Sequence, residues 1–245
     1  MEKNKDVATC KVRLVSTTKV DEKYIDYLVS SLPESQQEEV SNLLNNREGL
    51  MAYVARVSSS DPLNAKYAGL LKYCLQHKHW SVFEMVDVCM EIETSRAIAA
   101  QILRHKSANF QEFSQRYQEV PEDGFIVYRA RRQDNKNRQN SIDDLSEADI
   151  EFFDKAQKEV WKLSRSLYKE AISRNIAKEC ARFLLPLSTK TTLFMKGSLR
   201  TWIHYVDLRG ANGTQQEHMD IAIAARNVLV DYFPIVSEAM AWKKD

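Results

Sequence analysis

The stretch VDVCMEIE at residues 86–93 restricts the fold more than any other part of the chain. Apolar side chains alternate with others along it, which is the pattern of a β-strand with one buried face. The apolar face consists of Val86, Val88, Met90 and Ile92, and the other face of Asp87, Cys89, Glu91 and Glu93. The segment SRAIAAQILRH follows at once. Its good helix formers, with Ser95 as N-cap, predict a helix directly after the strand.

Helical patterns dominate the rest of the chain. They cover residues 20–31, 34–46, 50–57, 62–76, 147–173 and 198–209, and a shorter helix that carries Cys180 and Arg182 and ends before Pro186. Thr214 and Glu217 have the spacing of a capping box for a last long helix. Further strands are expected at 9–17 and 125–130. Because strands and helices do not alternate regularly, the prediction is an α+β fold with a small mixed or antiparallel sheet and several packed helices.

The segment 131–173 combines a polar part and a long amphipathic part. The polar residues 131–143 (RRQDNKNRQNSID) are predicted to form a mobile surface loop. In the helix that follows, apolar residues share one stripe, which we interpret as core. The stripe consists of Phe153, Ala156, Val160, Leu163, Leu167 and Ala171. A chain of 245 residues can bury one substantial core, so residues 1–245 are expected to form a single domain.

Charge and glycine content narrow the class of ligand. Lys and Arg number 35 and Asp and Glu 34, so no net positive field draws long polyanions to the chain. The six glycines form neither a G-x-G-x-x-G motif nor a Walker-type loop. Any bound phosphate must therefore be held by side chains or by helix N-termini.

The cysteines and histidines do not indicate a metal site. No C-x-x-C pair occurs among Cys10, Cys74, Cys89 and Cys180, so reduced thiols are expected. His77 and His79 have no carboxylate at ligand spacing, and no metal is predicted. The N-terminal residues MEKNKDVATCKV are polar, and no apolar run is long enough to span a bilayer. A reducing cytoplasmic location is therefore expected, with no membrane partner.

Residues 104–117, RHKSANFQEFSQRY, concentrate hydrogen-bond donors. Gln101, Arg104 and His105 have the spacing that places them on one face at the end of the helix that leads into this stretch. Three interpretations are open from composition: a solvated basic face, a nucleic-acid patch, or a pocket for a small anion. A second polar group lies within 198–217, where Arg200 and His204 are helical neighbours and Arg209 precedes a Gly-Ala-Asn-Gly turn. Surface salt bridges are an equally open interpretation of that group.

Four ordered segments resemble the flavin-dependent thymidylate synthases. The signature of this family is Arg-His-Arg, seven residues and Ser; here Arg104-His105-Lys106 is followed by seven residues and Ser114. Similar segments are the His-x-Ser with a downstream Glu at 79–84, ARFLLPL at 181–187, and SLRTWIHYVDLR…TQQE at 198–217. The resemblance extends over about residues 50–235.

The resemblance implies an activity and its participants. Members of the family have an α+β fold and make dTMP from dUMP, with methylenetetrahydrofolate as the carbon donor and NADPH as the reductant through FAD. They are typically homotetramers with sites built where subunits meet. A partner set of dUMP, folate and NADPH, a homotetramer, and no nucleic acid are therefore expected.

The resemblance also implies roles for residues of this chain. The dUMP-binding residues would be Gln101, Arg104, Glu112, Phe113, Ser114, Gln115, Arg116, Arg182 and Arg209. The FAD-binding residues would be Ser81, Arg104, His105, Lys106, Glu112, Ser198, Leu199, Arg200 and His204. Arg209 would be catalytic, because a fixed guanidinium stabilises negative charge that develops on the uracil ring. Ser114 is interpreted as a binding residue, since no base accompanies it in the sequence.

Two positions depart from the family pattern. Lys106 replaces the last Arg of the signature, which keeps the charge but removes the planar fork. Gly213 stands where members often carry a polar residue. These departures keep two alternatives open beside a synthase: a flavin-binding relative without synthase activity and a nucleic-acid-binding module.

Overall fold

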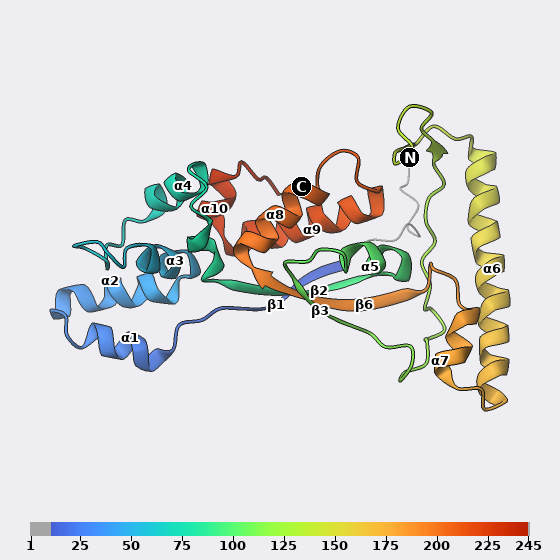
Figure 1. Cartoon of the computed structure of the whole chain (residues 1–245), viewed down its shortest axis with the longest axis horizontal. Helices are drawn as coiled ribbons and strands as arrows, with labels where there is room; N and C mark the ends of the chain where they lie inside the picture. Colours follow the sequence, from blue (N-terminus) through green and yellow to red (C-terminus); the bar gives the residue numbers. More distant parts are fainter. Residues whose placement is uncertain (1–10, 245) are drawn as a thin grey trace.

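The computed structural model describes residues 11–244, and its centre is an antiparallel sheet with the strand order β1-β2-β6-β3 (Figure 1). The bounds are β1 Lys11–Thr17, β2 Asp87–Ser95, β6 Lys190–Ser198 and β3 Asn109–Glu112. The predicted α+β class with a small antiparallel sheet is confirmed. The strand expected at 9–17 is confirmed from Lys11 onward, because residues 9 and 10 lie outside the described part.

The alternation at 86–93 has the predicted consequence. Val88, Met90 and Ile92 of β2 are 0% exposed, as is Val86 just before the strand. Opposite them, Met195 pairs with Met90 and Leu193 with Ile92 in the antiparallel β2–β6 register. Burying each such side chain contributes about 1.5–3 kcal/mol, so this pair of strands is the centre of the core.

Three helices cover one face of the sheet (Figure 1). They are α5 Arg96–Ile102, α8 Leu199–Arg209 and α9 Gln216–Tyr232. As predicted, Ser95 caps α5 by accepting from the N–H of Ile98, and Ser198 caps α8 by accepting from that of Thr201. Trp202 is 0% exposed and its Nε1–H donates to the carbonyl of Val88 at 3.0 Å, which ties α8 to the central strand.

The N-terminal helices pack beside the sheet and meet the short helix near the C-terminal end of the chain (Figure 1). Their bounds are α1 Glu22–Val29, α2 Glu34–Asn45, α3 Arg47–Ala55 and α4 Ala68–Gln76, followed by the 3-10 helix η1 Trp80–Glu84. The predictions for 20–31, 34–46 and 50–57 are confirmed within a few residues. The helix expected over 62–76 begins only at Ala68. The short helix α10 Pro234–Ala239 packs on α4.

Two local predictions were wrong. Residues 125–130 form no regular strand; only Phe125 makes an isolated bridge to Thr189, and its ring stacks on Trp161. The capping box at Thr214 does not form either. Gln215 is the N-cap of α9 and makes no side-chain cap bond, while the Thr214 hydroxyl donates to the carbonyl of Leu208 at 3.4 Å. At Phe125, contacts with distant residues outweigh the local pattern, and at Thr214 a carbonyl of the preceding helix takes the hydroxyl instead.

The polar segment 131–143 contains a two-stranded ribbon. The strands are β4 Arg132–Gln133 and β5 Ser141–Ile142. Arg129 pairs with Asp143 at 2.9 Å and Arg132 with Asp144 at 2.6 Å across its base. These exposed pairs each contribute little, about 0–1 kcal/mol. The mobility of this segment stays a prediction.

The long helix α6 Glu147–Ser173 lies at one end of the molecule, with α7 Lys178–Ala181 beside it (Figure 1). The 3-10 helix η2 Arg182–Leu184 follows α7. The predicted length of α6 is confirmed, and so is the burial of Ala171, which is 6% exposed, but the assignment of most of the stripe to the core is wrong. Val160, Leu163 and Leu167 are 52%, 64% and 43% exposed, and Phe153 is exposed as well. Helical spacing reveals an apolar face, but it does not reveal whether the same chain covers that face.

The helices of residues 11–244 include none with both the length and the apolar character needed to cross a membrane.

The contact between α3 and α10 rests on a buried carboxylate. Glu48 is 1% exposed and accepts hydrogen bonds from the backbone N–H groups of Ile235 and Val236 at 3.2 and 2.8 Å. Desolvation raises the pKa of this carboxyl group. The two backbone donors would have no acceptor in its absence.

We therefore expect Glu48→Ala to lower the free energy of unfolding by about 3 kcal/mol, because two buried donors lose their partner. Urea unfolding at a fixed protein concentration measures the change. The exposed Glu39→Ala on α2 is the control and is expected to stay within about 0.5 kcal/mol of the wild type. Equal effects of both substitutions would contradict this role of Glu48.

Candidate active site

A cavity of about 440 Å³ lies between η1, the turn after α5, and α8. Its lining consists of Trp80, Glu84, Ser107, Arg200, Thr201, Ile203, His204 and Asp207. Arg200 Nη1 and Glu84 Oε1 are 2.9 Å apart, and both side chains are about half exposed. The wall therefore joins two of the segments that carry the sequence motifs, 79–84 and 198–209.

Three residues of the predicted flavin set occur on or next to this wall, and two have other roles. Arg200 and His204 line the cavity, and Ser81 stands between Trp80 and Glu84 on η1. The Ser198 side chain caps α8, and Leu199 is 0% exposed in the core. Ser198 and Leu199 therefore direct the first turn of α8, which places Arg200 at the cavity.

His105 links the end of α5 to α8. It is 6% exposed, its ring centroid lies 5.6 Å from that of His204, and its Nε2 is 3.1 Å from the hydroxyl of Ser107. Burial lowers the pKa of His105, and the nearby His204 and Arg209 lower it further. A neutral imidazole therefore stands beside the cavity wall, within electrostatic reach of Arg209.

Three cations near His105 have uncommitted donors. The side chains of Arg104 and Lys106 are exposed and form no hydrogen bond or ion pair within residues 11–244. Arg209 Nε is buried, and no described residue accepts its proton. Buried donors in folded proteins are normally paired, so an unpaired one on the helix that lines the cavity indicates a place for an acceptor.

The turn after α5 departs slightly from the predicted geometry. The helix ends at Ile102, and the N–H groups of Arg104 and His105 donate to the carbonyls of Gln101 and Ile102 at 3.2 and 3.0 Å. These i to i+3 bonds tighten the chain after the helix. The shared face predicted for Gln101, Arg104 and His105 thus becomes a helix end followed by a tight turn.

The loop after β3 carries the rest of the RHKSANFQEFSQRY motif. Glu112 Oε1 accepts from the Thr191 hydroxyl at 2.9 Å and pairs with Arg96, so this carboxylate is committed to the sheet. The carbonyl of Ser114 accepts from the N–H groups of Tyr117 and Gln118, and its hydroxyl accepts from the N–H of Arg116 at 3.4 Å. Phe113 is half-buried, and its N–H donates to the carbonyl of Thr192 at 2.9 Å.

The same loop reaches the α6–α7 end of the molecule. Arg116 lies 3.3 Å from Glu179 of α7. Gln115 is 6% exposed, and its Nε2 has no acceptor within the described residues. Arg182, in η2, lies with its guanidinium 5.5 Å from the Phe183 ring centroid. The predicted nucleotide-binding residues therefore lie in two groups: Gln101, Arg104 and Arg209 at the α5–α8 contact, and 112–116 with Arg182 near α7.

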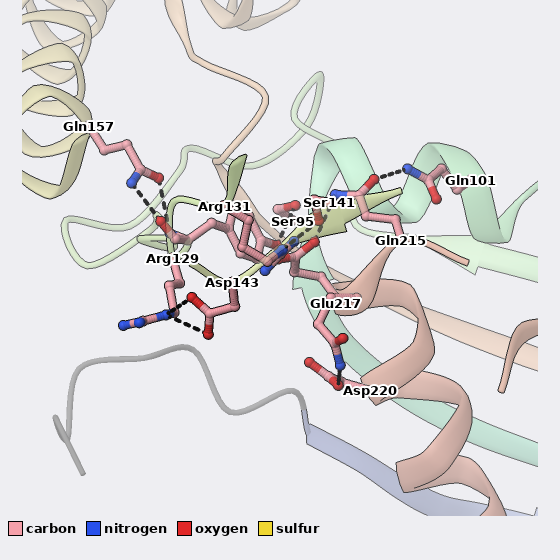
Figure 2. A network of polar contacts seen from close by, with 12 residues as sticks. Ser95, Gln101, Arg129, Arg131, Ser141, Asp143, Gln157, Gln215, Glu217 and Asp220 are labelled. Atoms are coloured by element: carbon pink, nitrogen blue, oxygen red, sulfur yellow. Dashed lines mark hydrogen bonds and ion pairs between the residues drawn. The ribbon is translucent and has the colours of Figure 1, made fainter. Parts of the chain in front are cut away.

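A polar network behind Arg209 was not found from sequence. Gln101 Nε2 donates to Gln215 Oε1 at 2.6 Å, and Arg131 pairs with Glu217 at 2.6 Å (Figure 2). His218 is 0% exposed and contacts Gln101 and the hydroxyl of Tyr205 through its two ring nitrogens. The one available signal was the position of His218 near the start of the predicted helix after Thr214, next to its apolar residues. A histidine buried there would require hydrogen-bond partners.

Comparison with known proteins identifies the family. A family model described as "Thymidylate synthase complementing protein" matches residues 13–235. A flavin-dependent thymidylate synthase of Synechocystis sp. is 54% identical over 195 residues, which are 80% of this chain and 90% of that protein. A probable flavin-dependent thymidylate synthase of Paramecium bursaria Chlorella virus 1 is 51% identical over 201 residues, covering 81% and 93% of the two chains.

The fold occurs among solved structures as well. A UMP/dUMP methylase, PolB from Streptomyces cacaoi, bound with 5-Br dUMP, has a TM-score of 0.75 and 20% identity, covering 96% of both chains. The chain therefore has an α+β fold that is also found in a nucleotide methylase. It belongs to the thymidylate synthase complementing protein family, and the resemblance found in its four motifs is confirmed.

The buried His218 makes a prediction for stability in acid. Burial lowers its pKa from 6.5 to about 4, and Arg209 and His105 add to the effect. Between these two values the unfolded chain binds a proton that the folded chain does not. The stability from the neutral ring is thus fully present above the unfolded pKa and is lost as the pH falls toward 4.

We expect this group to lower the free energy of unfolding by up to about 1.4 kcal/mol per pH unit in that window. Urea unfolding at a series of pH values between neutrality and mild acid measures the slope. His218→Gln has no titrating ring, and its slope is expected to be shallower. An identical slope in the two proteins would assign the acid sensitivity to other groups.

Proposed function

We propose that this chain is a flavin-dependent thymidylate synthase, a methyltransferase that converts dUMP to dTMP. One observation carries the proposal: the motif segments 79–84 and 198–209 meet the start of the RHKSANFQEFSQRY motif where the turn after α5 approaches α8, and there Arg104, Lys106 and Arg209 have uncommitted donors. A nucleoside monophosphate has a dianionic phosphate and a flat base with carbonyl oxygens. Guanidinium forks match both groups.

The nucleotide would be held by residues from both groups of the site. We assign dUMP binding to Gln101, Arg104, Glu112, Phe113, Ser114, Gln115, Arg116, Arg182 and Arg209. Gln115 Nε2 and Arg209 Nε support this assignment, because both are buried donors without an acceptor among the described residues. Glu112 orients the loop through Arg96 and Thr191. Ser114 acts by hydrogen bonding, not as a nucleophile.

The cavity residues fit a flavin cofactor. Arg200 and His204 on the wall, with the neighbouring Arg104, His105 and Lys106, offer cations and ring donors to a polar, phosphate-bearing molecule. We assign FAD binding to these residues with Ser81 and Glu112, and we give Ser198 and Leu199 the task of positioning Arg200. A bound flavin would supply the redox chemistry, while the protein supplies binding and orientation.

Arg209 is the catalytic residue that we propose. Negative charge develops on the pyrimidine ring when its C6 accepts a hydride, and it spreads toward the carbonyl oxygens. A guanidinium held at the end of α8, with one donor shielded from water, would stabilise that charge without reorganisation. His105 and His218 are neutral, so Arg209 is the positive group beside these two rings.

The remaining participants are also proposals. NADPH as the reductant and methylenetetrahydrofolate as the carbon donor follow from family membership. Residues 1–245 would act as one domain in a homotetramer, and the exposed apolar stripe of α6 supports self-association. The thiols of Cys74, Cys89 and Cys180, unpaired in the structure, are compatible with the cytoplasmic location expected from sequence.

Arg209→Ala is expected to lower the rate of dTMP formation at least about 100-fold, because one preorganised charge-stabilising group is lost. The assay measures dTMP from dUMP with FAD, NADPH and methylenetetrahydrofolate. The control is Arg174→Ala, which removes an exposed guanidinium that, among residues 11–244, pairs with Glu170 on α6. Unchanged turnover in Arg209→Ala would contradict the catalytic assignment.

The visible absorption spectrum of the wild type, with and without dUMP, tests the proposed function itself. A flavin spectrum that dUMP perturbs would place both ligands in one site. A yellow protein that makes no dTMP would instead be the flavin-binding relative without synthase activity. A colourless protein that also fails to bind added FAD would overturn the proposal.

Leu163→Glu tests self-association through α6. The substitution places a carboxylate at a position that is 64% exposed in the single chain but would be buried between subunits. Burying an unpaired charge there would be costly. Light scattering after size exclusion is expected to show smaller assemblies than the wild type. The control Lys158→Glu places a carboxylate on another, exposed side of the helix and is expected to leave the assembly unchanged. The same mass for both variants would exclude this face as an interface.

A further inference from the structure

Six side chains form one continuous hydrogen-bonded series behind Arg209. From the surface inward they are Arg131, Glu217, Gln215, Gln101, His218 and Tyr205. The successive donor–acceptor distances are 2.6, 2.8, 2.6, 3.3 and 3.1 Å. Figure 2 shows the outer part of the series, where the ribbon segment 131–143 meets the start of α9 and the end of α5. The inner part, His218 and Tyr205, is 0% exposed.

The outer end of the series sets the direction of every hydrogen bond in it. Glu217 is ion-paired with Arg131 and can only accept, so the amide nitrogen of Gln215 must face it. The carbonyl oxygen of Gln215 then faces Gln101 and needs a donor, which is Gln101 Nε2. The carbonyl oxygen of Gln101 is thereby turned toward His218.

The hydrogen bonds at the inner end, those of His218 and Tyr205, run in the same direction. The Gln101 oxygen requires a proton on Nδ1 of His218, and the neutral ring carries only that one ring N–H. Nε2 is then a lone pair, and the hydroxyl of Tyr205 donates to it. The low pKa of His218 agrees with a neutral ring. A positive His218 would also face Arg209, whose charge helps to keep the ring neutral.

The consequence for Gln101 is a fixed amide. A glutamine side chain has three rotatable bonds and can exchange its oxygen and nitrogen by a half-turn of the amide. Here such a half-turn would place N–H against N–H at His218 and oxygen against oxygen at Gln215. The series therefore leaves one N–H and one oxygen lone pair of Gln101 uncommitted and in defined places.

We propose that His218, supported by Tyr205, is a positioning residue that orients the amide of Gln101 for recognition of the nucleotide base. His218 would contact no ligand and would act only through Gln101. The proposal rests on the proposed function, because it takes Gln101 as a contact of dUMP. It adds a residue from outside all four motifs, and it gives the buried histidine a task beyond filling the core.

The test uses the full-length enzyme and the steady-state kinetics of dUMP methylation. His218→Leu removes both polar contacts of the ring, and Tyr205→Phe with His218→Leu also removes the hydroxyl that contacts this ring. Removing both partners of a buried hydrogen bond costs less than removing one, so the double variant is expected to keep the fold. His218→Gln is the conservative variant, because one end of a glutamine amide donates and the other accepts. Thermal unfolding of each variant separates loss of structure from loss of orientation.

We expect the double variant to raise the KM for dUMP about tenfold, the effect of one misplaced hydrogen bond, with kcat nearly unchanged. His218→Gln is expected to retain most of the wild-type KM. In a Gln101→Ala background, the same replacement of His218 is expected to add nothing, because residues that act through one contact are not additive. This coupling would not arise if His218 only filled the core.

The opposing results are equally specific. Two results would overturn the positioning role of His218 and leave the proposed function standing. One is a wild-type KM in the double variant. The other is a His218 replacement that raises the KM as much in the Gln101→Ala background as it does in the wild type. A wild-type enzyme that neither binds nor methylates dUMP would overturn the proposed function and the positioning role with it. Activity in the wild type therefore distinguishes the two failures.

Discussion

The pairing of β2 with β6 is the constraint on which the rest of the structure depends. The two strands are antiparallel over their whole lengths, and each continues directly into a helix. The first N–H of α5, at Arg96, donates to the carbonyl of Thr189 beside β6, and that of α8, at Leu199, donates to Val86 beside β2. Each helix start is thus tied to the other strand. Because the strands run in opposite directions, the helices start at opposite ends of the sheet and fold back over one face, where the end of α5 meets α8.

This meeting point explains the chemistry of the site. Cations from the turn after α5 and from the end of α8 would repel one another unless anionic ligands or neutral neighbours separate them. The two histidines between them, His105 and His218, are both held neutral by burial. The positive charges beside these rings are consequently those of Arg104, Lys106 and Arg209. The chain has almost no net charge, so its basic motif acts only locally. Such a motif suits the binding of a small anionic ligand.

Several features followed from residues that are close together in the sequence. Alternation defined β2, and the serine caps defined the starts of α5 and α8, because both depend on local backbone geometry. The four motifs predicted the family. The polar network of the site could not be predicted from the sequence. Arg131, Tyr205 and His218 join it only after α9 and the ribbon segment 131–143 pack against α5. Gly213 stands where relatives are often polar, and its φ of +97° favours glycine over any L side chain.

The sequence by itself determined the fold class, the main helices, the central strand and the family, since periodicity, capping and short motifs are encoded over a few neighbouring residues. Only the tertiary structure decided which apolar faces are covered and which polar groups meet. The stripe of α6 has the spacing of a core helix, yet Leu163 is exposed, because burial depends on a surface from elsewhere. Residues 125–130 have strand-like composition, yet their partners are Thr189, Ser188 and Trp161, not a neighbouring strand. Burial and pairing are properties of the whole packed chain, and local pattern cannot specify them.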